Sequence, residues 1–257
     1  MKKITCFVLV SLFFAAAAGA QDAAAIVRNS RDRITADTIS TRSRMVITAR
    51  DGTTSERVLD QYSKDGQRGG RTIIVFQRPA GVANTRFLTM ENPGASDDRW
   101  IFLPSLGKVR RIAASEGSSS FMGTDLSYDD ISSADRDVDL DNHRLVREEA
   151  YGGNPCYVIE SIPKDTSYQY SKMIQWIDKN TKVNHKVELY DRRGTLVKVL
   201  EILKLENVQG RLSSMETKMS TLTAGTSTTI YVDILKYNDP IPEGVFTPTY
   251  LETGRPQ

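Results

Sequence analysis

Apolar and polar residues alternate along most of this chain, and short turn sequences interrupt the alternation. A period of two is typical of a half-buried strand, because successive side chains of a strand point to opposite faces. Met45, Ile47 and Ala49 show it first, and Asp51-Gly52 then supplies a hairpin turn. The same signals predict strands over residues 44–50, 56–62, 71–78, 86–91, 99–103, 108–113, 145–149, 156–163, 172–178, 183–191, 196–208, 212–222 and 228–236.

The connections between these strands are short and rich in turn residues, as at 152–155, 178–181 and 191–194. No helical crossover separates the strands, so the pattern favours an antiparallel sheet over a parallel α/β fold. One amphipathic helix is predicted over residues 22–34, where Ala23, Ile26 and other apolar residues recur at helical spacing. No repeat or linker divides residues 21–257, which we expect to form a single, mainly β domain.

The first twenty residues have the organisation of a cleaved secretory signal. Lys2 and Lys3 precede an apolar run over residues 4–17, and Ala18-Gly19-Ala20 forms a cleavage pattern. The alternative is a membrane anchor, but a helix needs about 20 apolar residues to span a bilayer. We therefore expect export and cleavage near Ala20.

The charge balance limits the classes of partner. The 257 residues include 34 basic and 32 acidic side chains, and removal of the signal makes the two numbers equal. Such a chain has no overall driving force toward nucleic acid, which is bound through phosphate neutralisation. With only two cysteines and two histidines, we predict no disulfide framework, no metal site and no cofactor.

Cys156 is the cysteine that remains after signal removal. We expect it to be a small buried residue of a strand, because the alternative, a catalytic thiol, needs a nearby histidine and a strand-to-helix turn. The sequence also contains no nucleophile elbow, phosphate-binding loop or dinucleotide fingerprint. We therefore predict that the protein is not an enzyme and has no catalytic residues.

Residues 114–142 interrupt the strand pattern and carry many aspartates. A long segment without a strand in a compact β protein suggests a functional lid or an irregular helical insertion. Residues 125–131 are expected to form one or two helical turns with Asp125 as the cap. The aspartates are interpreted as a solvated, helix-capping face; calcium binding is the alternative, but their spacing does not match a calcium loop.

Two neighbouring segments carry a resemblance to a known family: DRWIFLPSLGKVRRI at 98–112 and SSFMGTDLSYDDI at 119–131. Together with QWIDKNT at 175–181, ELYDRRGTLVK at 188–198 and IPEGVF at 241–246, they resemble exported outer-membrane lipoprotein-sorting proteins of the LolA/LolB-like superfamily. The resemblance covers most of the chain after the signal.

The resemblance implies a curved, incomplete antiparallel barrel of about eleven strands, covered on its concave side by a few helices. It also implies a periplasmic carrier or chaperone for the acyl chains of lipoproteins or other lipids, moving them toward the outer membrane. An inner-membrane exporter of the resistance-nodulation-division or ABC type is an implied partner, and we expect a monomer. No residue here matches the gating arginine of the carrier proper.

Some strands are apolar on both faces, so one face is expected to meet the cover or the cargo. The candidate cavity-lining residues are Ile74, Phe76, Leu88, Met90, Trp100, Phe102, Phe121, Met122, Ile174 and Trp176. For each of them core packing is the alternative, and alternation alone does not say which face of a strand is concave.

A second functional reading stays open. The same fold would also suit a non-carrying, lipid-sensing or accessory module of an envelope transporter or stress regulator. The two readings differ in whether the protein holds stoichiometric cargo.

Overall fold

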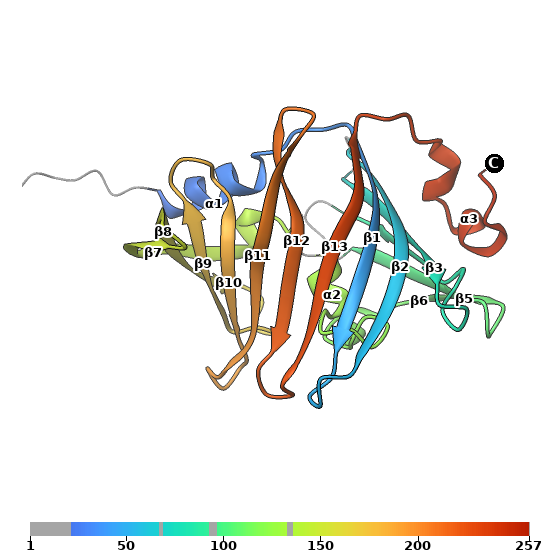
Figure 1. Cartoon of the computed structure of the whole chain (residues 1–257), viewed down its shortest axis with the longest axis horizontal. Helices are drawn as coiled ribbons and strands as arrows, with labels where there is room; N and C mark the ends of the chain where they lie inside the picture. Colours follow the sequence, from blue (N-terminus) through green and yellow to red (C-terminus); the bar gives the residue numbers. More distant parts are fainter. Residues whose placement is uncertain (1–21, 67–68, 93–96, 133–135, 257) are drawn as a thin grey trace, which may run out of the picture.

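The computed structural model describes residues 22–66, 69–92, 97–132 and 136–256; the predicted signal, residues 1–20, lies outside them (Figure 1). The described residues form one antiparallel sheet, and every predicted run contains a strand. The strands are β1 (Thr38–Thr48), β2 (Thr54–Lys64), β3 (Arg71–Arg78), β4 (Arg86–Met90), β5 (Asp98–Leu103), β6 (Lys108–Arg111), β7 (Asp141–Tyr151), β8 (Asn154–Pro163), β9 (Lys172–Asp178), β10 (Asn184–Tyr190), β11 (Leu196–Val208), β12 (Arg211–Thr221) and β13 (Thr226–Tyr237). The helices are α1 (Ala23–Arg31), α2 (Tyr128–Ser132) and α3 (Pro248–Thr253), with 3₁₀ turns η1 (Ala114–Glu116), η3 (Val138–Leu140) and η4 (Glu243–Phe246).

The sheet is not closed into a barrel, because β6 and β7, which follow each other in the chain, do not pair. Consecutive strands pair from β1 to β6 and from β7 to β13, and β1 then pairs with β13, with Ile39 opposite Tyr237. The edges are therefore β6 and β7. The curved, incomplete barrel is confirmed, but it has thirteen strands rather than about eleven, because each of the short runs in the first half forms a strand of its own.

The curvature gives the sheet an inner and an outer face. In Figure 1 the central strands face the viewer, and β7 and β8 at one end and β5 and β6 at the other run behind them. Directly paired residues share a face, so the register places Ile74, Phe87 and Ile101 on one side. We call this side the inner face, because the segment between β6 and β7 packs on it.

Helix α1 begins as predicted and ends earlier. The Asp22 carboxylate accepts a hydrogen bond from the Ala24 N–H at 3.0 Å, and the helix ends at Arg31 rather than at residue 34. Ile26 packs against Ile159 and Ile177, which covers the inner face at the β7–β9 end.

The C-terminal segment covers the outer face of the other end. Phe246 and Leu251, of η4 and α3, pack on Ile73 and Leu88. Figure 1 places α3 outside the curve of the sheet, away from α2. Both faces of β3 and β4 are therefore buried, which is why their sequences are apolar without alternation.

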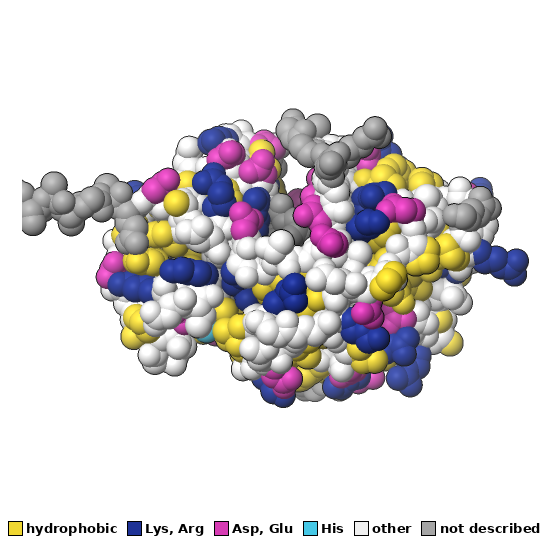
Figure 2. Space-filling view, turned by 90° about the horizontal axis from the view of Figure 1, so that it is seen from above, with side chains coloured by type: hydrophobic (Ala, Val, Ile, Leu, Met, Phe, Trp, Pro, Cys, Tyr) yellow, Lys and Arg dark blue, Asp and Glu magenta, His cyan; other side chains and the backbone are white. Residues whose placement is uncertain are grey.

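The surface agrees with the balanced composition. Seen from above, basic and acidic side chains are intermixed over the face of the molecule (Figure 2). Among the described residues, the helices are too short or too polar to cross a bilayer.

Candidate functional site

The inner face of the sheet is apolar and is covered by residues 114–132, which we call the cover. The cover belongs to the connection between the two edge strands, β6 and β7. Its Phe121 and Tyr128 pack with buried side chains of β1 to β5 and with Ile112, which follows β6; the sheet residues are Met45, Leu59, Ile74, Phe76, Phe87 and Ile101. A single segment outside the sheet therefore shields the apolar floor of this half of the barrel.

Phe121 is the central side chain of the cover. It is completely buried, and its ring lies 5.2 Å from the Phe87 ring in an edge-on arrangement and 5.7 Å from the Phe76 ring. Tyr128 contacts Phe121 edge-on at 5.7 Å. Edge-to-face aromatic contacts add to the free energy of burial, so this aromatic group holds the cover on β3 and β4.

A tight loop presents Phe121 to the sheet. Residues 120 and 127 form an isolated antiparallel bridge, and the Phe121 N–H donates to the Leu126 carbonyl at 2.7 Å. The loop turns at Met122 and Gly123, which both have positive φ; glycine adopts this conformation without steric cost. The Thr124 hydroxyl donates to the Phe121 carbonyl at 2.7 Å, which completes the internal bonding of the loop.

The other half of the cover packs on β10 to β13. Leu126 is buried with Leu189 and Met219, and Ile131 packs partly buried against the same cluster. The cover therefore bridges the two halves of the sheet.

Asp125 anchors the cover to β13 rather than capping a helix. Its carboxylate accepts hydrogen bonds from the Thr226 hydroxyl and, at 2.7 Å, from the Thr228 hydroxyl. The helical turn predicted here forms as α2, but Ser127 caps it: the Asp130 N–H donates to the Ser127 hydroxyl, and the Ser127 N–H donates to the Asp130 carboxylate. The prediction of Asp125 as the cap was therefore wrong, because a serine closer to the helix makes the reciprocal capping pair.

The two aspartates of α2 reach opposite halves of the sheet. Asp129 accepts from Arg99 of β5 at 2.6 Å, and Asp130 accepts from Lys198 of β11 at 2.8 Å. The Asp130 side chain is 5% exposed. The predicted solvated acidic face is thus a set of buried anchors at these positions, because the sheet supplies their partners.

Gly117 makes room for Asp129. A Cβ atom at this glycine would lie 2.2 Å from an Asp129 carboxylate oxygen, which is far below a van der Waals contact. The Asp129 N–H also donates to the Gly117 carbonyl at 2.9 Å. The absence of a side chain at this position therefore lets α2 pack against η1.

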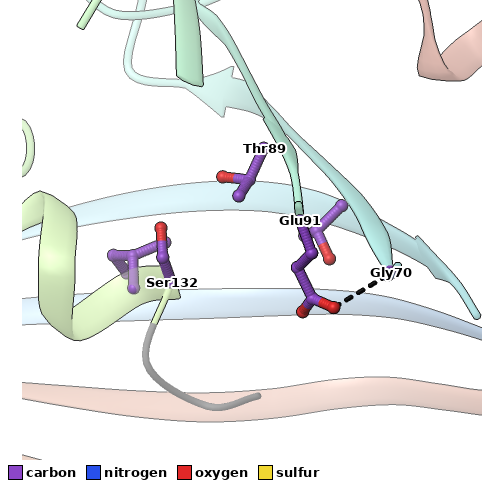
Figure 3. A pocket seen from close by; sticks show the side chains of 6 residues that line it. Gly70, Thr89, Glu91 and Ser132 are labelled. Atoms are coloured by element: carbon purple, nitrogen blue, oxygen red, sulfur yellow. Dashed lines mark hydrogen bonds between the residues drawn. The ribbon is translucent and has the colours of Figure 1, made fainter. Parts of the chain in front are cut away.

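A small pocket lies between the inner face and the end of α2 (Figure 3). Its volume is about 20 Å³, which suits about one water molecule. Its walls are polar and apolar: Gly70, Thr72, Thr89, Glu91, Ile131 and Ser132. The Glu91 carboxylate accepts from the Gly70 N–H at 2.7 Å. With the cover in place, this pocket has no room for an acyl chain.

The predicted lining residues divide between the two faces. Ile74, Phe76, Phe121 and Met122 belong to the inner cluster beneath or within the cover. The other six side chains lie on the outer face, opposite to the expected side: Leu88, Met90, Trp100, Phe102, Ile174 and Trp176. Contact with a lipid stays a prediction for the inner four.

Packing on the outer face accounts for these six residues. The C-terminal segment buries Leu88 and packs against Met90, Trp100 and Phe102. Ile174 and Trp176 pack with Cys156, Val158 and the ring of Tyr151 in a separate cluster. Core packing, the alternative to cavity lining, therefore fits these six residues.

Cys156 is fully buried in β8, as predicted. Burial raises the pKa of its thiol, which keeps the nucleophilic thiolate form scarce.

The sequence reasoning missed several inner-face residues. Met45, Leu59, Phe87 and Ile101 complete the floor beneath Phe121, and Lys198 binds the cover from β11. Strand register could have found three of them, since Phe87 pairs with Ile74, Ile101 pairs with Phe87, and Leu59 pairs with Phe76. Nothing in the local sequence marks Lys198, which reads as an ordinary charged strand residue.

A serine and a histidine also meet inside the molecule. His143 Nδ1 lies 2.8 Å from the Ser161 hydroxyl, and Nε2 donates to the Val138 carbonyl at 2.9 Å. Ser161 is fully buried, and its oxygen also accepts from the Gln175 amide at 2.7 Å. The Ser161 hydroxyl is closed off from solvent, and its hydrogen bonds join β7, β8 and β9.

Comparison with known proteins adds a family and a fold. A family of uncharacterised proteins matches residues 69–253. Among solved structures, a DUF1329 family protein from Desulfovibrio piger is 30% identical, with a TM-score of 0.85 over 89% of this chain and 97% of that one. A domain assigned to outer-membrane lipoprotein sorting in Vibrio parahaemolyticus is 25% identical, with a TM-score of 0.84 over 90% of this chain and 98% of that one.

A LolA superfamily protein from Nitrosomonas europaea has the same fold at 21% identity, with a TM-score of 0.72 over 89% of this chain and 98% of that one. Among curated proteins, none matches the chain significantly. The similarity extends over nearly the whole of each of these structures.

Proposed function

The chain belongs to the family of uncharacterised proteins that matches residues 69–253, with the DUF1329 protein as a relative, and we propose that it is a periplasmic lipid carrier. In this proposal it binds acyl chains of lipoproteins or other lipids on the inner face of its sheet and moves them toward the outer membrane. The observation that carries the proposal is the apolar inner face, whose middle part is shielded by a segment outside the sheet, the cover. The resemblance to lipoprotein-sorting and LolA-like proteins is confirmed for the fold.

Lipid transfer needs such a surface. Exposure of one methylene group costs about 0.8 kcal/mol, so a chain of about sixteen carbons costs on the order of 12 kcal/mol in water. A curved apolar sheet can lower this cost by replacing water around the chain. The same surface must be shielded when no lipid is present, and the cover provides that shield.

In this proposal the cover and the cargo occupy the same place in turn. Phe121 and Leu126 fill the inner face in the closed molecule, so an acyl chain enters only after they leave. The free energy of burying the chain offsets the loss of the cover's contacts. Because the two terms oppose each other, the grip on the cargo is moderate, which suits a protein that must also release it.

A reversible cross-link tests this exchange. The Asp125 N–H donates to the Thr228 hydroxyl at 2.9 Å, and the two side chains are also hydrogen-bonded, so we expect cysteines at both positions to form a disulfide under oxidising conditions. Native Cys156 is buried in β8 and does not compete. We expect D125C/T228C to lose binding of a fluorescent fatty acid when oxidised and to regain it with dithiothreitol. Equal binding by the oxidised and reduced forms would overturn the proposal that cargo displaces the cover.

The filled inner face also favours the second candidate, a non-carrying accessory module. Such a module would keep its cover closed and use its outer surface for a partner. An inner-membrane exporter of the resistance-nodulation-division or ABC type is the partner that we propose for either function: as the source of cargo for a carrier, or as the binding partner of a module. Stoichiometric lipid on the purified protein separates the two.

A further inference from the structure

The carboxylate of Asp130 lies in a binding site made by other parts of the chain. Lys198 Nζ of β11 donates to one of its oxygens at 2.8 Å, and the Tyr170 hydroxyl donates to the other at 2.9 Å. The Gln169 amide donates to the Ser127 hydroxyl at 2.8 Å and, more weakly, to an Asp130 carboxylate oxygen at 3.5 Å. Three donors from outside the cover therefore converge on an anion that the cover supplies.

These donors lie in a poorly hydrated place. The Lys198 side chain is 16% exposed, and Tyr170 is 4% exposed. Burial, and after it the Asp130 charge, raises the pKa of the Tyr170 hydroxyl, which therefore stays protonated and able to donate. Charge-assisted hydrogen bonds in such surroundings are stronger than those in water.

Departure of the cover would leave Lys198 without its counter-ion. Among the described residues, Asp130 is the acidic group within ion-pair distance of Lys198. An occupant that then buried the Lys198 ammonium group without supplying an anion would leave that charge desolvated and unpaired, which is unfavourable. The site thus favours an anionic occupant of the inner face once the cover has moved.

Lys198 also lies at the correct position for the head of an amphiphile. It is the third residue of β11 and pairs with Thr221, the last residue of β12, so it lies near the end of the sheet. Leu189 is its direct neighbour on β10, and Leu200 and Met219 continue the apolar surface away from that end. A charged head bound at Lys198 would therefore direct an acyl chain along the inner face.

We propose that the cargo is an anionic amphiphile, and that its oxyanion headgroup binds Lys198, Tyr170 and Gln169 in the place of the Asp130 carboxylate. This inference rests on the proposed carrier function and adds the charge of the headgroup to it. The cover then mimics both parts of the ligand: Asp130 stands for the headgroup, and Leu126 and Phe121 stand for the chain.

A selectivity ratio tests the headgroup site. Dissociation constants for dodecanoate and for dodecanol are measured by calorimetry at pH 8. Both ligands must displace the same cover, so the ratio of the two constants cancels the cost of opening. We expect the wild type to prefer dodecanoate by about tenfold or more, as for a hydrogen-bonded charge, and D130N/K198M to bind both ligands about equally.

An ion pair on the outer face supplies the matched control. Lys186 and Glu188 lie 2.7 Å apart and are buried to a similar degree, so E188Q/K186M removes an equivalent pair away from the inner face and should keep the preference. Y170F keeps the ring and removes one donor, and it should lower the ratio several-fold even where D130N/K198M fails to fold. Inorganic phosphate, which has no chain, should not compete with dodecanoate at equal concentration.

The outcomes separate the two proposals. Binding of both ligands with the same ratio in the wild type, Y170F and D130N/K198M would overturn the headgroup site and leave the carrier function standing. Binding of neither ligand by the wild type would overturn the carrier function, and the headgroup site with it.

Discussion

Single residues decide which apolar surface is available and which is permanently packed. Phe121 and Phe246 are both fully or almost fully buried, but the first packs on the inner face and the second on the outer face. The sequence predicted Phe121 as a lining residue, yet it could not separate Ile74 from Leu88. Both faces of the strands around them are buried, so hydrophobicity carries no information about curvature.

Replacement of Phe121 by alanine should weaken the fold and strengthen ligand binding. Loss of a buried phenylalanine costs about 3–5 kcal/mol of unfolding free energy. Part of that free energy opposes displacement of the cover, and recovery of about 1.4 kcal/mol would tighten binding of a fluorescent fatty acid tenfold. Urea unfolding and fluorescence titration measure the two effects.

Phe246→Ala is the control at the same scale. It should lower the unfolding free energy by a similar amount and leave the affinity for the fatty acid unchanged, because Phe246 belongs to the C-terminal segment and packs on the outer face. A tighter affinity in both variants would mean that general loosening, rather than removal of Phe121, admits the probe.

Among the elements, the sequence predicted all the strands but the conformation of the cover only in part. Each strand is encoded locally by alternation and turns, so every predicted run contains a strand. The cover has hydrogen bonds of its own, but its placement on the sheet depends on distant partners such as Thr228 and Lys198. That dependence explains why the sequence indicated an insertion there but not its anchors.

Packing of α2 on η1 predicts an unusual response at Gly117. Its backbone is in the right-handed helical region, where alanine normally stabilises by about 0.4–1 kcal/mol through the unfolded state. Here the new Cβ would displace the Asp129 carboxylate and break its pair with Arg99. We expect G117A to destabilise the wild type and to stabilise a D129A background, as measured by urea unfolding.

This reversal is the signature of a direct steric conflict, because independent sites give additive changes in unfolding free energy. The same sign in both backgrounds would contradict the assigned contact between residue 117 and Asp129.

On the scale of the whole molecule, the sheet is open and the cover belongs to the connection between its two edges. The functional question is whether the cover leaves the inner face. The fold was predictable from strand pattern and resemblance, and the similarity to DUF1329 and LolA superfamily structures confirms it. Whether the inner face opens was not predictable, because the closed form and the proposed open form share one sequence and differ only in which apolar groups meet.

Native mass spectrometry of the protein purified from the cell envelope should therefore reveal lipid. A carrier is expected to retain stoichiometric acyl adducts, and the headgroup site predicts that those adducts are acidic lipids. Oxidised D125C/T228C, purified in the same way, should carry none. Protein without adducts in both cases would favour the accessory module.

The pairing of β1 with β13 has a consequence for biogenesis. Ile39 meets Tyr237 in the middle of the sheet, whereas all other strand pairs are formed by successive hairpins. Each half can thus assemble as a meander soon after synthesis, but the seam between them waits for the last strand, a contact of very long sequence separation that slows folding. A chain that stops before β13 would lose a central strand rather than an edge strand, so the two halves of its sheet would not be joined.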